Sequence, residues 1–307
     1  MKQKEIRDME KRAERLNAIL KEKNSEFHVV YYRNWKNNVA HEGYVLQSED
    51  TGDKISIMDP VIYTDSIIEN WYEKTDSEVV ELFLKLYKAM VIMEPFPIKE
   101  FKNKEFLLNR ILPRLLGSEN NKKELLKAGK VFVQLENLDL LMTFAIPLGE
   151  PESPKEAEVS VPVSHELLEL ADVTIEEAKN HALANIEKLA KVESMNEVLN
   201  ELLGTDDYYD TESETMIICT NTNKCYGAAT ILCPSVQEEL QRRLGDEVFV
   251  LPSSIHEMIA VSSSSSIYGA DALQAMVQVI NEDQVELDEQ LTNSVYMLRD
   301  GKLERVA

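Results

Sequence analysis

The sequence predicts an α+β fold in which short antiparallel sheets pack with helices in two lobes. Amphipathic segments with an apolar residue at every third or fourth position predict the helices, and short runs rich in β-branched and aromatic residues predict the strands. Brief polar stretches join those runs, which favours antiparallel pairing. The 307 residues are 44% hydrophobic and 29% charged, a composition typical of one or two globular domains.

The chain opens with a predicted amphipathic helix that ends near Asn24. Its apolar residues share one face: Ile6, Met9, Ala13, Leu16 and Leu20. We expect that face to pack against its own domain rather than to bind a partner, because a single apolar stripe on a terminal helix normally docks locally.

Three strands followed by two helices are predicted over the next seventy residues or so. Three short antiparallel strands are predicted at 27–33, 43–47 and 54–60. Two helices are predicted after them, at 64–73 and 75–93. The second helix begins at a capping box, since Thr75 can accept an early amide N–H while Glu78 reaches back. Prolines after residue 93 end it.

The stretch from residue 104 to residue 157 predicts two helices, two strands and a boundary. The first helix is predicted at 104–116, and Pro113 is expected to kink or shorten it. The shorter elements are a helix at 124–130 and strands at 131–135 and 140–146. Residues 149–157 contain prolines and charges but no apolar anchor, so we interpret them as a domain boundary or a long surface loop.

Beyond residue 157 the sequence again predicts mixed helices and strands. Helices are predicted at 164–171, 175–192, 235–245 and 270–280. Two of them begin at capping boxes, Thr174 with Glu177 and Ser235 with Glu238. The apolar face of the helix predicted at 270–280 consists of Leu273, Met276, Val277 and Ile280. A strand is predicted at 247–251. One hairpin is predicted to pair 215–220 with 226–232 across the turn 221–224. A second hairpin is predicted to pair 295–298 with 302–306 across Asp300 and Gly301.

Charge is distributed unevenly along the chain, whose formal net charge is −22. Residues 1–150 hold 23 Lys and Arg against 25 Asp and Glu, whereas residues 151–307 hold 10 against 30. We therefore divide the chain into a near-neutral lobe, 1–150, and a strongly acidic lobe, 151–307, unless the two form one continuous domain. The acidic half repels phosphate backbones, so we expect no direct nucleic-acid binding and favour a basic protein surface as the partner.

Several classes of protein are disfavoured by the sequence. No apolar run is long enough to span a bilayer, and the charged N-terminal segment lacks the apolar stretch that a secretory signal needs, so we expect a cytoplasmic protein without membrane contact. The thiols Cys219, Cys225 and Cys233 have neither disulfide-framework nor zinc-site spacing and are expected to be reduced. The chain has no phosphate-binding glycine motif, and no two histidines lie three or four residues apart, so neither a cofactor nor a metal is predicted. The oligomeric state is not predicted.

The densest polar cluster is Leu-Pro-Ser-Ser-Ile-His-Glu-Met-Ile, residues 251–259. Ser253, Ser254, His256 and Glu257 supply two hydroxyls, an imidazole and a carboxylate, the groups that a serine hydrolase needs. The cluster lacks a nucleophile-elbow motif and has no second histidine for a zinc motif. We favour a structural role, in which Ser254 and Glu257 form the capping box of a helix.

Three segments in the acidic half are informative about relatives: VSHELLELADVTIEEAKNHALANI, GAATILCPSVQEELQRRLGDEVFVLPSSIHEMI and LQAMVQVINEDQVELDEQLTNSVYML. Through them most of the chain resembles an uncharacterised family, a domain of unknown function widespread in gut Firmicutes. Looser matches lie at NKKELLKAGKVFVQLENLDLLMTFAIPL and IMDPVIYTDSIIENWYE. The resemblance implies no activity, cofactor or catalytic residue.

Three functions remain open from the sequence, and the least favoured of them is metal binding by dispersed histidines and carboxylates. The favoured hypothesis is a non-catalytic binding or regulatory protein that acts through its acidic surface. A sharper form of it is an antagonist that mimics the charge of DNA and occupies a host or defence protein. The alternative is a hydrolase that uses Ser253 or Ser254 with His256 and Glu257.

Overall fold

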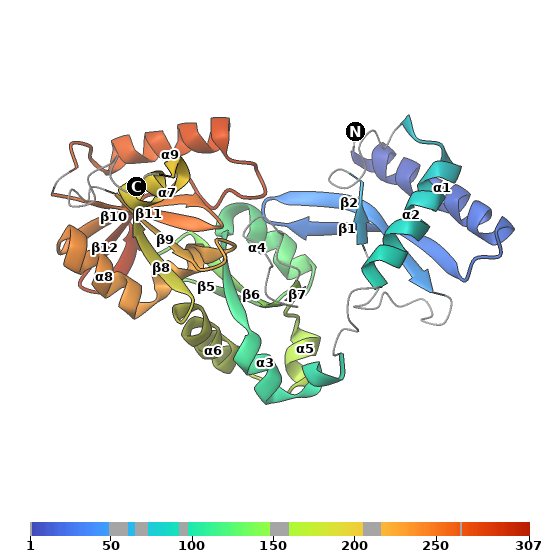
Figure 1. Ribbon diagram of the computed structural model, residues 1–307, viewed down its shortest axis with the longest axis horizontal. Coiled ribbons are helices and arrows are strands. Elements are labelled where there is room, and N and C mark those ends of the chain that lie inside the picture. Colours follow the sequence, from blue (N-terminus) through green and yellow to red (C-terminus); the bar gives the residue numbers. More distant parts are fainter. Residues whose placement is uncertain are drawn as a thin grey trace. The chain divides into compact units, whose positions relative to one another are not determined.

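The computed structural model describes residues 2–48, 61–64, 73–91, 98–147, 160–204, 216–264 and 266–307 (Figure 1). The chain divides into two compact units, Met1–Pro97 and Ile98–Ala307. Both units combine helices with antiparallel sheets, so the predicted α+β class is confirmed. The boundary predicted at 149–157 lies outside the described residues, and the division into lobes at residue 150 stays a prediction.

The first unit is built from two helices and one three-stranded sheet. Its elements are α1 (Lys2–Glu22), β1 (Phe27–Lys36), β2 (Val39–Ser48), β3 (Val61–Tyr63) and α2 (Asp76–Val91), and the antiparallel sheet has the order β1-β2-β3. One face of the sheet packs against both helices through Val29, Tyr44, Leu46 and Ile62. The predicted stripe of the opening helix is confirmed where its side chains are described: Met9, Ala13, Leu16 and Leu20 are buried. The strand predicted at 54–60 and most of the helix predicted at 64–73 lie outside the described residues.

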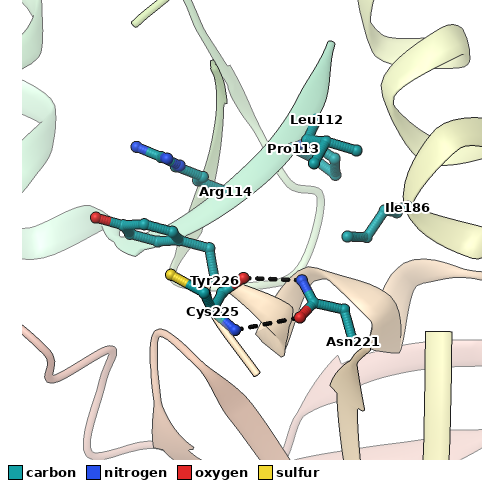
Figure 2. A pocket seen from close by; sticks show the side chains of 7 residues that line it. All are labelled: Leu112, Pro113, Arg114, Ile186, Asn221, Cys225 and Tyr226. Carbon is teal, nitrogen blue, oxygen red and sulfur yellow. Dashed lines mark hydrogen bonds between the residues drawn. The ribbon is translucent and has the colours of Figure 1, made fainter. Parts of the chain in front are cut away.

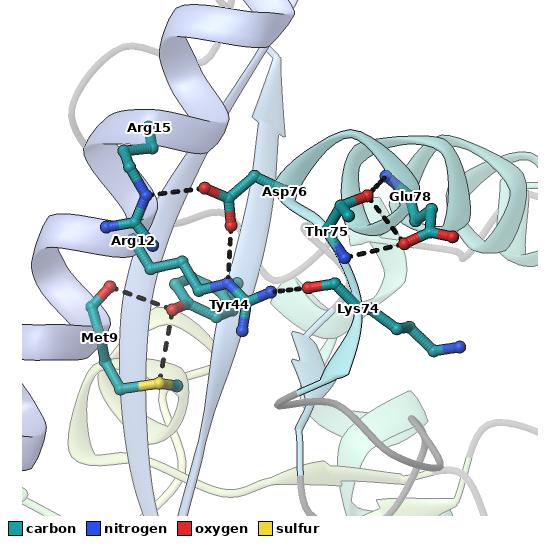
Figure 3. Close-up of polar contacts among 8 residues, drawn as sticks. All are labelled: Met9, Arg12, Arg15, Tyr44, Lys74, Thr75, Asp76 and Glu78. Carbon is teal, nitrogen blue, oxygen red and sulfur yellow. Dashed lines mark hydrogen bonds and ion pairs between the residues drawn. The ribbon is translucent and has the colours of Figure 1, made fainter.

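Polar contacts join α1 to the start of α2 (Figure 3). Asp76 accepts hydrogen bonds from Nε of Arg12 at 2.9 Å and from Nε of Arg15 at 2.6 Å. Burial opposes ionisation of Asp76, but the bonds from the two arginines outweigh it and lower the pKa of the carboxyl. The predicted capping box is confirmed, since Thr75 N–H donates to Glu78 and Glu78 N–H donates to the Thr75 hydroxyl.

The second unit contains a four-stranded sheet formed by its first half. The elements are η3 (Ile98–Lys102), α3 (Lys104–Arg110), β4 (Leu112–Gly117), α4 (Ser118–Lys127), β5 (Phe132–Gln134), β6 (Leu140–Pro147) and β7 (Ser160–Pro162). The strands run in the order β4-β6-β5, and β7 also pairs with β6. The helix predicted at 104–116 is wrong beyond Arg110, because residues 112–117 form a strand. Pro113 has no N–H for a helix and is tolerated in a strand that, among the described residues, pairs on one side alone.

The second half of this unit forms a six-stranded antiparallel sheet with the order β13-β12-β10-β11-β9-β8. Two helices, α5 (His165–Leu170) and α6 (Ile175–Glu187), precede it. The remaining elements are β8 (Ala190–Ser194), α7 (Met195–Leu203), β9 (Met216–Asn221), η4 (Gly227–Leu232), α8 (Pro234–Leu244), β10 (Glu247–Ser254), β11 (Glu257–Ser262), α9 (Ala270–Gln284), β12 (Tyr296–Arg299) and β13 (Lys302–Arg305). Figure 1 shows α8 and α9 beside this sheet.

Three predictions for this half are wrong. The helix predicted to reach residue 192 ends at Glu187, and residues 190–194 form β8, which pairs with β9. The hairpin of 215–220 with 226–232 does not form, because residues 227–232 are a 3₁₀ helix and β9 pairs with β8 and β11. The capping box of Ser235 is absent as well: α8 begins at Pro234, and the Ser235 hydroxyl donates to Glu187 at 2.6 Å. Proline is already fixed near a helical φ, so it starts the helix without a hydroxyl cap.

Other predictions for this half are confirmed. The capping box of α6 forms, with Thr174 and Glu177 bonded reciprocally. The C-terminal hairpin turns at Asp300 and Gly301, which both have a positive φ, as a tight two-residue turn between antiparallel strands requires. The helix predicted at 270–280 is α9, although only part of its predicted apolar face is buried. Among the described residues, no helix is long and apolar enough to cross a bilayer.

Candidate functional site

The polar cluster lies at the turn between β10 and β11. Ser254 pairs with Glu257 across this turn, and the Ser254 hydroxyl accepts a 3.0 Å hydrogen bond from the backbone N–H of His256. The expectation that Ser254 and Glu257 cap a helix is therefore wrong. The residues after Glu257 are mostly buried and pair with both β10 and β9, so a strand rather than a helix follows the turn.

The imidazole of His256 is held from both sides. Its Nδ1 atom accepts a 3.0 Å hydrogen bond from the backbone N–H of Tyr226, and its Nε2 atom lies 3.5 Å from Oε1 of Glu289. A backbone N–H can only donate, so Nδ1 carries no proton and the neutral ring carries its proton on Nε2. That proton faces Glu289.

The two serines are bonded to other groups. The Ser253 hydroxyl donates to Oε1 of Glu257 at 3.0 Å, and the Ser254 hydroxyl accepts from the His256 backbone. Neither hydroxyl is hydrogen-bonded to the His256 imidazole, although a serine nucleophile needs a base within that reach. The four predicted residues therefore come together as a braced turn and do not form a nucleophile with its base.

The backbone of this turn is anchored by three neighbouring segments. Ile255 N–H donates to the Glu289 carbonyl at 2.8 Å, and the Thr220 hydroxyl of β9 donates to the His256 carbonyl at 2.8 Å. Gly227 lies against the same turn, because a Cβ atom built on it would come 2.7 Å from the His256 carbonyl oxygen and 2.5 Å from the Asn221 backbone nitrogen. Only a residue without a side chain allows η4 to approach β9 and the turn this closely.

Residues outside the predicted cluster complete the site. Figure 2 shows a small pocket beside Tyr226, lined by Leu112, Pro113, Arg114, Ile186, Asn221, Cys225 and Tyr226. The Arg114 guanidinium stacks over the Tyr226 ring, with its Cζ atom 3.6 Å from the ring centroid. The centroids of the Tyr226 and His256 rings lie 5.4 Å apart. The Asn221 side chain bonds both the N–H and the carbonyl of Cys225. The pocket is too narrow to enclose a water molecule.

Sequence reasoning missed Tyr226 and Arg114 as members of this site. Tyr226 adopts a left-handed conformation, φ 53°, which is uncommon for a residue other than glycine and is indicated by no local pattern. Arg114 comes from β4, more than a hundred residues away along the chain. Asn221 was expected in a turn, and its side chain does build the turn that precedes Tyr226.

The remaining histidines and cysteines are dispersed. The histidines lie on β1 (His28), β2 (His41), α5 (His165) and α6 (His181), and among the described residues no three His, Cys, Asp or Glu side chains are placed to share a metal ion. None of the cysteines forms a disulfide. Burial raises the pKa of the Cys219 and Cys233 thiols to about 12, whereas Cys225 lies half-buried beside the pocket.

The structure is that of an α+β protein. Its β10–β11 turn is held by a hydrogen bond from Tyr226, at the start of η4, to His256 and by a hydrogen bond from His256 to Ser254. A family model matches residues 9–299, and the chain belongs to that family, a family of unknown function (DUF5688). The expected membership in an uncharacterised family is confirmed. No curated protein and no solved structure matches the chain.

Proposed function

We propose that the protein is a binding or regulatory protein whose residues 151–307 engage a basic surface of a partner protein. The observation that carries the proposal is the concentration of charge: this part of the chain holds 30 acidic residues against 10 basic ones. A field of one sign attracts an oppositely charged partner over a distance of about one Debye length, roughly 8 to 10 Å in physiological salt.

The described carboxylates support this reading. No Lys or Arg occurs between Arg243 and Arg299. The acidic residues in that interval are Asp246, Glu247, Glu257, Asp271, Glu282, Asp283, Glu286, Asp288 and Glu289. Glu247 pairs with Arg299 at 3.1 Å, and Glu257 and Glu289 belong to the braced turn. The others are exposed or half-buried and present their charge toward solvent.

The geometry of the serine and histidine cluster does not favour the hydrolase alternative. His256 accepts a backbone N–H at Nδ1 and faces Glu289 at Nε2, so neither nitrogen is directed at Ser253 or Ser254. A binding function requires nothing of these groups beyond the stability of the turn.

Affinity capture from lysate of the source cells tests the proposal, with bound proteins identified by mass spectrometry at about 50 mM and about 500 mM salt. A variant neutralises five exposed acids of the second unit: Glu169→Gln, Glu238→Gln, Asp246→Asn, Glu282→Gln and Asp283→Asn. A matched control neutralises five exposed acids of the first unit: Asp8→Asn, Glu10→Gln, Glu14→Gln, Glu22→Gln and Glu26→Gln.

We expect a basic protein that the wild type and the control retain at low salt and that the second-unit variant loses. The purified partner should then bind directly, with an affinity that falls as salt rises. Equal retention by both variants would overturn the proposal. Competition by duplex DNA for the same partner would support its sharper form, in which the acidic surface mimics DNA.

A further inference from the structure

Exposed apolar side chains gather around helix α9. Among the described residues eleven large hydrophobic side chains are exposed, and six of them lie between residues 267 and 287. They are Ile267, Tyr268, Met276, Val279, Ile280 and Leu287. Apolar surface that is clustered rather than scattered marks an interaction site more often than chance exposure.

The sequence of α9 gives it two apolar faces. Leu273, Val277 and Asn281 form the buried face, which packs on β10, β11 and β12 of the six-stranded sheet. Met276, Val279 and Ile280 follow the same spacing of three and four but on a different side, and they are 40%, 56% and 51% exposed. Figure 1 shows α9 beside the six-stranded sheet, and the exposed fractions of Met276, Val279 and Ile280 place its second face toward solvent.

The exposure does not come from a loosely attached helix. The side chain of Asn281 donates to the Thr292 carbonyl at 3.1 Å and to Oδ1 of Asn293 at 2.7 Å. The side chain of Gln290 donates to the carbonyls of Asn281 and Val285 at 2.7 and 2.8 Å, which satisfies the end of the helix. The second apolar face is therefore presented on a fixed scaffold, and a partner that binds it orders little of the helix.

The charges beside this face identify the occupant. Asp271, Glu282, Asp283 and Glu286 are exposed on α9 or directly after it, and residues 244–298 contain no Lys or Arg. A second copy of the chain would bring an equally acidic α9 and would be repelled. A complementary occupant has an apolar stripe flanked by Lys and Arg.

We propose that the outer face of α9 is the docking surface for a basic amphipathic helix of a partner protein. An amphipathic helix can lay a stripe of apolar side chains against Met276, Val279 and Ile280 while its basic residues meet the acidic rim. This inference rests on the proposed function and gives it a contact surface and a class of partner.

Two synthetic peptides of about 14 residues, or about four helical turns, test the proposal. One carries leucines at helical spacing with Lys and Arg on both flanks, and the other is a scrambled sequence of the same composition, so that the charge is equal. Binding is measured by fluorescence anisotropy. The variant is Val279→Ser with Ile280→Ser, and the control is Leu126→Ser with Leu170→Ser, which removes two apolar side chains that are 63% and 52% exposed on other helices.

We expect the amphipathic peptide to bind the wild type and the control at least about tenfold more tightly than the scrambled peptide, and the α9 variant to lose that preference. Equal binding of both peptides, or unchanged binding by the α9 variant, would overturn the α9 surface and leave the proposed function standing. If neither peptide binds at low salt, the α9 surface is overturned, and the proposed function is then decided separately by the capture experiment. If sedimentation of the protein alone shows a dimer that the α9 variant abolishes, the face is covered by a second copy and the proposal is wrong.

Discussion

The backbone N–H of Tyr226 donates a 3.0 Å hydrogen bond to Nδ1 of His256. This bond joins the start of η4 to the turn between β10 and β11, thirty residues further along the chain. It fixes the imidazole so that Nε2 faces Glu289 at 3.5 Å. The residue that offered the strongest sign of catalysis in the sequence is thus a brace between two loops, and its chemistry can be tested separately from its stability.

We expect an alkyl fluorophosphonate to leave Ser253 and Ser254 unmodified. Serine reacts with this reagent when a neighbouring base removes its proton, and the hydroxyls here are bonded to Glu257 and to a backbone N–H instead of to an imidazole nitrogen. Intact-mass spectrometry followed by peptide mapping checks the outcome, with a known serine protease labelled in parallel. An adduct on either serine would show that the braced turn is an active site.

Replacing His256 should destabilise the second unit. His256→Ala removes the acceptor of the Tyr226 N–H and leaves space beside the aromatic ring, at a cost of about 1–3 kcal/mol in the free energy of unfolding. Glu289→Gln is the control, since an amide oxygen can lie in the same place 3.5 Å from Nε2 and the exposed site tolerates the change within about 0.5 kcal/mol. Urea denaturation of both variants measures the difference, and equal stability would mean that the Tyr226 bond contributes nothing.

Much of the fold was predictable because local chemistry determines it. The capping boxes at Thr75 and Thr174, the buried stripe of α1 and the hairpin at Asp300 all depend on residues that are close together in the sequence. The wrong assignments depend on distant contacts. Residues 227–232 contain β-branched and aromatic neighbours that fit a strand, yet they form a 3₁₀ helix because Gly227 is pressed against β9 and the β10–β11 turn.

The arrangement of the candidate site could not be predicted from the sequence for the same reason, because it depends on distant contacts. Ser253, Ser254, His256 and Glu257 are neighbours in sequence and were identified together, but their roles depend on partners that no local pattern reveals. Tyr226 reaches His256 only because a left-handed residue turns the backbone N–H toward the imidazole, and Arg114 reaches Tyr226 from another sheet. A pattern of residue types can therefore propose a cluster, whereas the hydrogen-bond partners of its members come from distant parts of the chain.

Gly227→Ala should be severely destabilising. The added Cβ atom would lie 2.4 Å from the Thr220 hydroxyl oxygen, and two further atoms within 3 Å belong to the backbone, which cannot move aside cheaply. We expect a loss of about 2–4 kcal/mol in the free energy of unfolding. Gly269→Ala is the matched control, because a Cβ there meets no atom within 4 Å. Thermal unfolding of both proteins checks the contrast, and a similar midpoint for the two would contradict the close packing of η4.

The three cysteines should differ in reactivity. Burial raises the pKa of Cys219 and Cys233 to about 12, so almost no thiolate is present near pH 8, whereas Cys225 is half-buried beside the pocket. A disulfide reagent that releases a chromophore should react quickly with one thiol in the native protein and with all three in denaturant. Cys225→Ser should remove the fast reaction, and a fast reaction that survives this substitution would place an accessible thiol at Cys219 or Cys233.

Acid should remove the contribution of Glu177 to stability. A hydrogen bond from Lys104 at 2.7 Å, together with the capping bonds from Thr174, lowers the pKa of this carboxyl to about 2 from 4.5. A carboxyl with a lowered folded-state pKa stabilises the fold above the unfolded value and loses that effect as pH falls. We therefore expect Glu177→Gln to be less stable than the wild type above pH 4.5, with the gap closing as pH falls from about 4.5 toward about 2. Urea unfolding across this pH range measures the difference in free energy of unfolding, with Glu176→Gln as an exposed control. A difference between wild type and Glu177→Gln that does not change with pH would show that the ion pair contributes nothing.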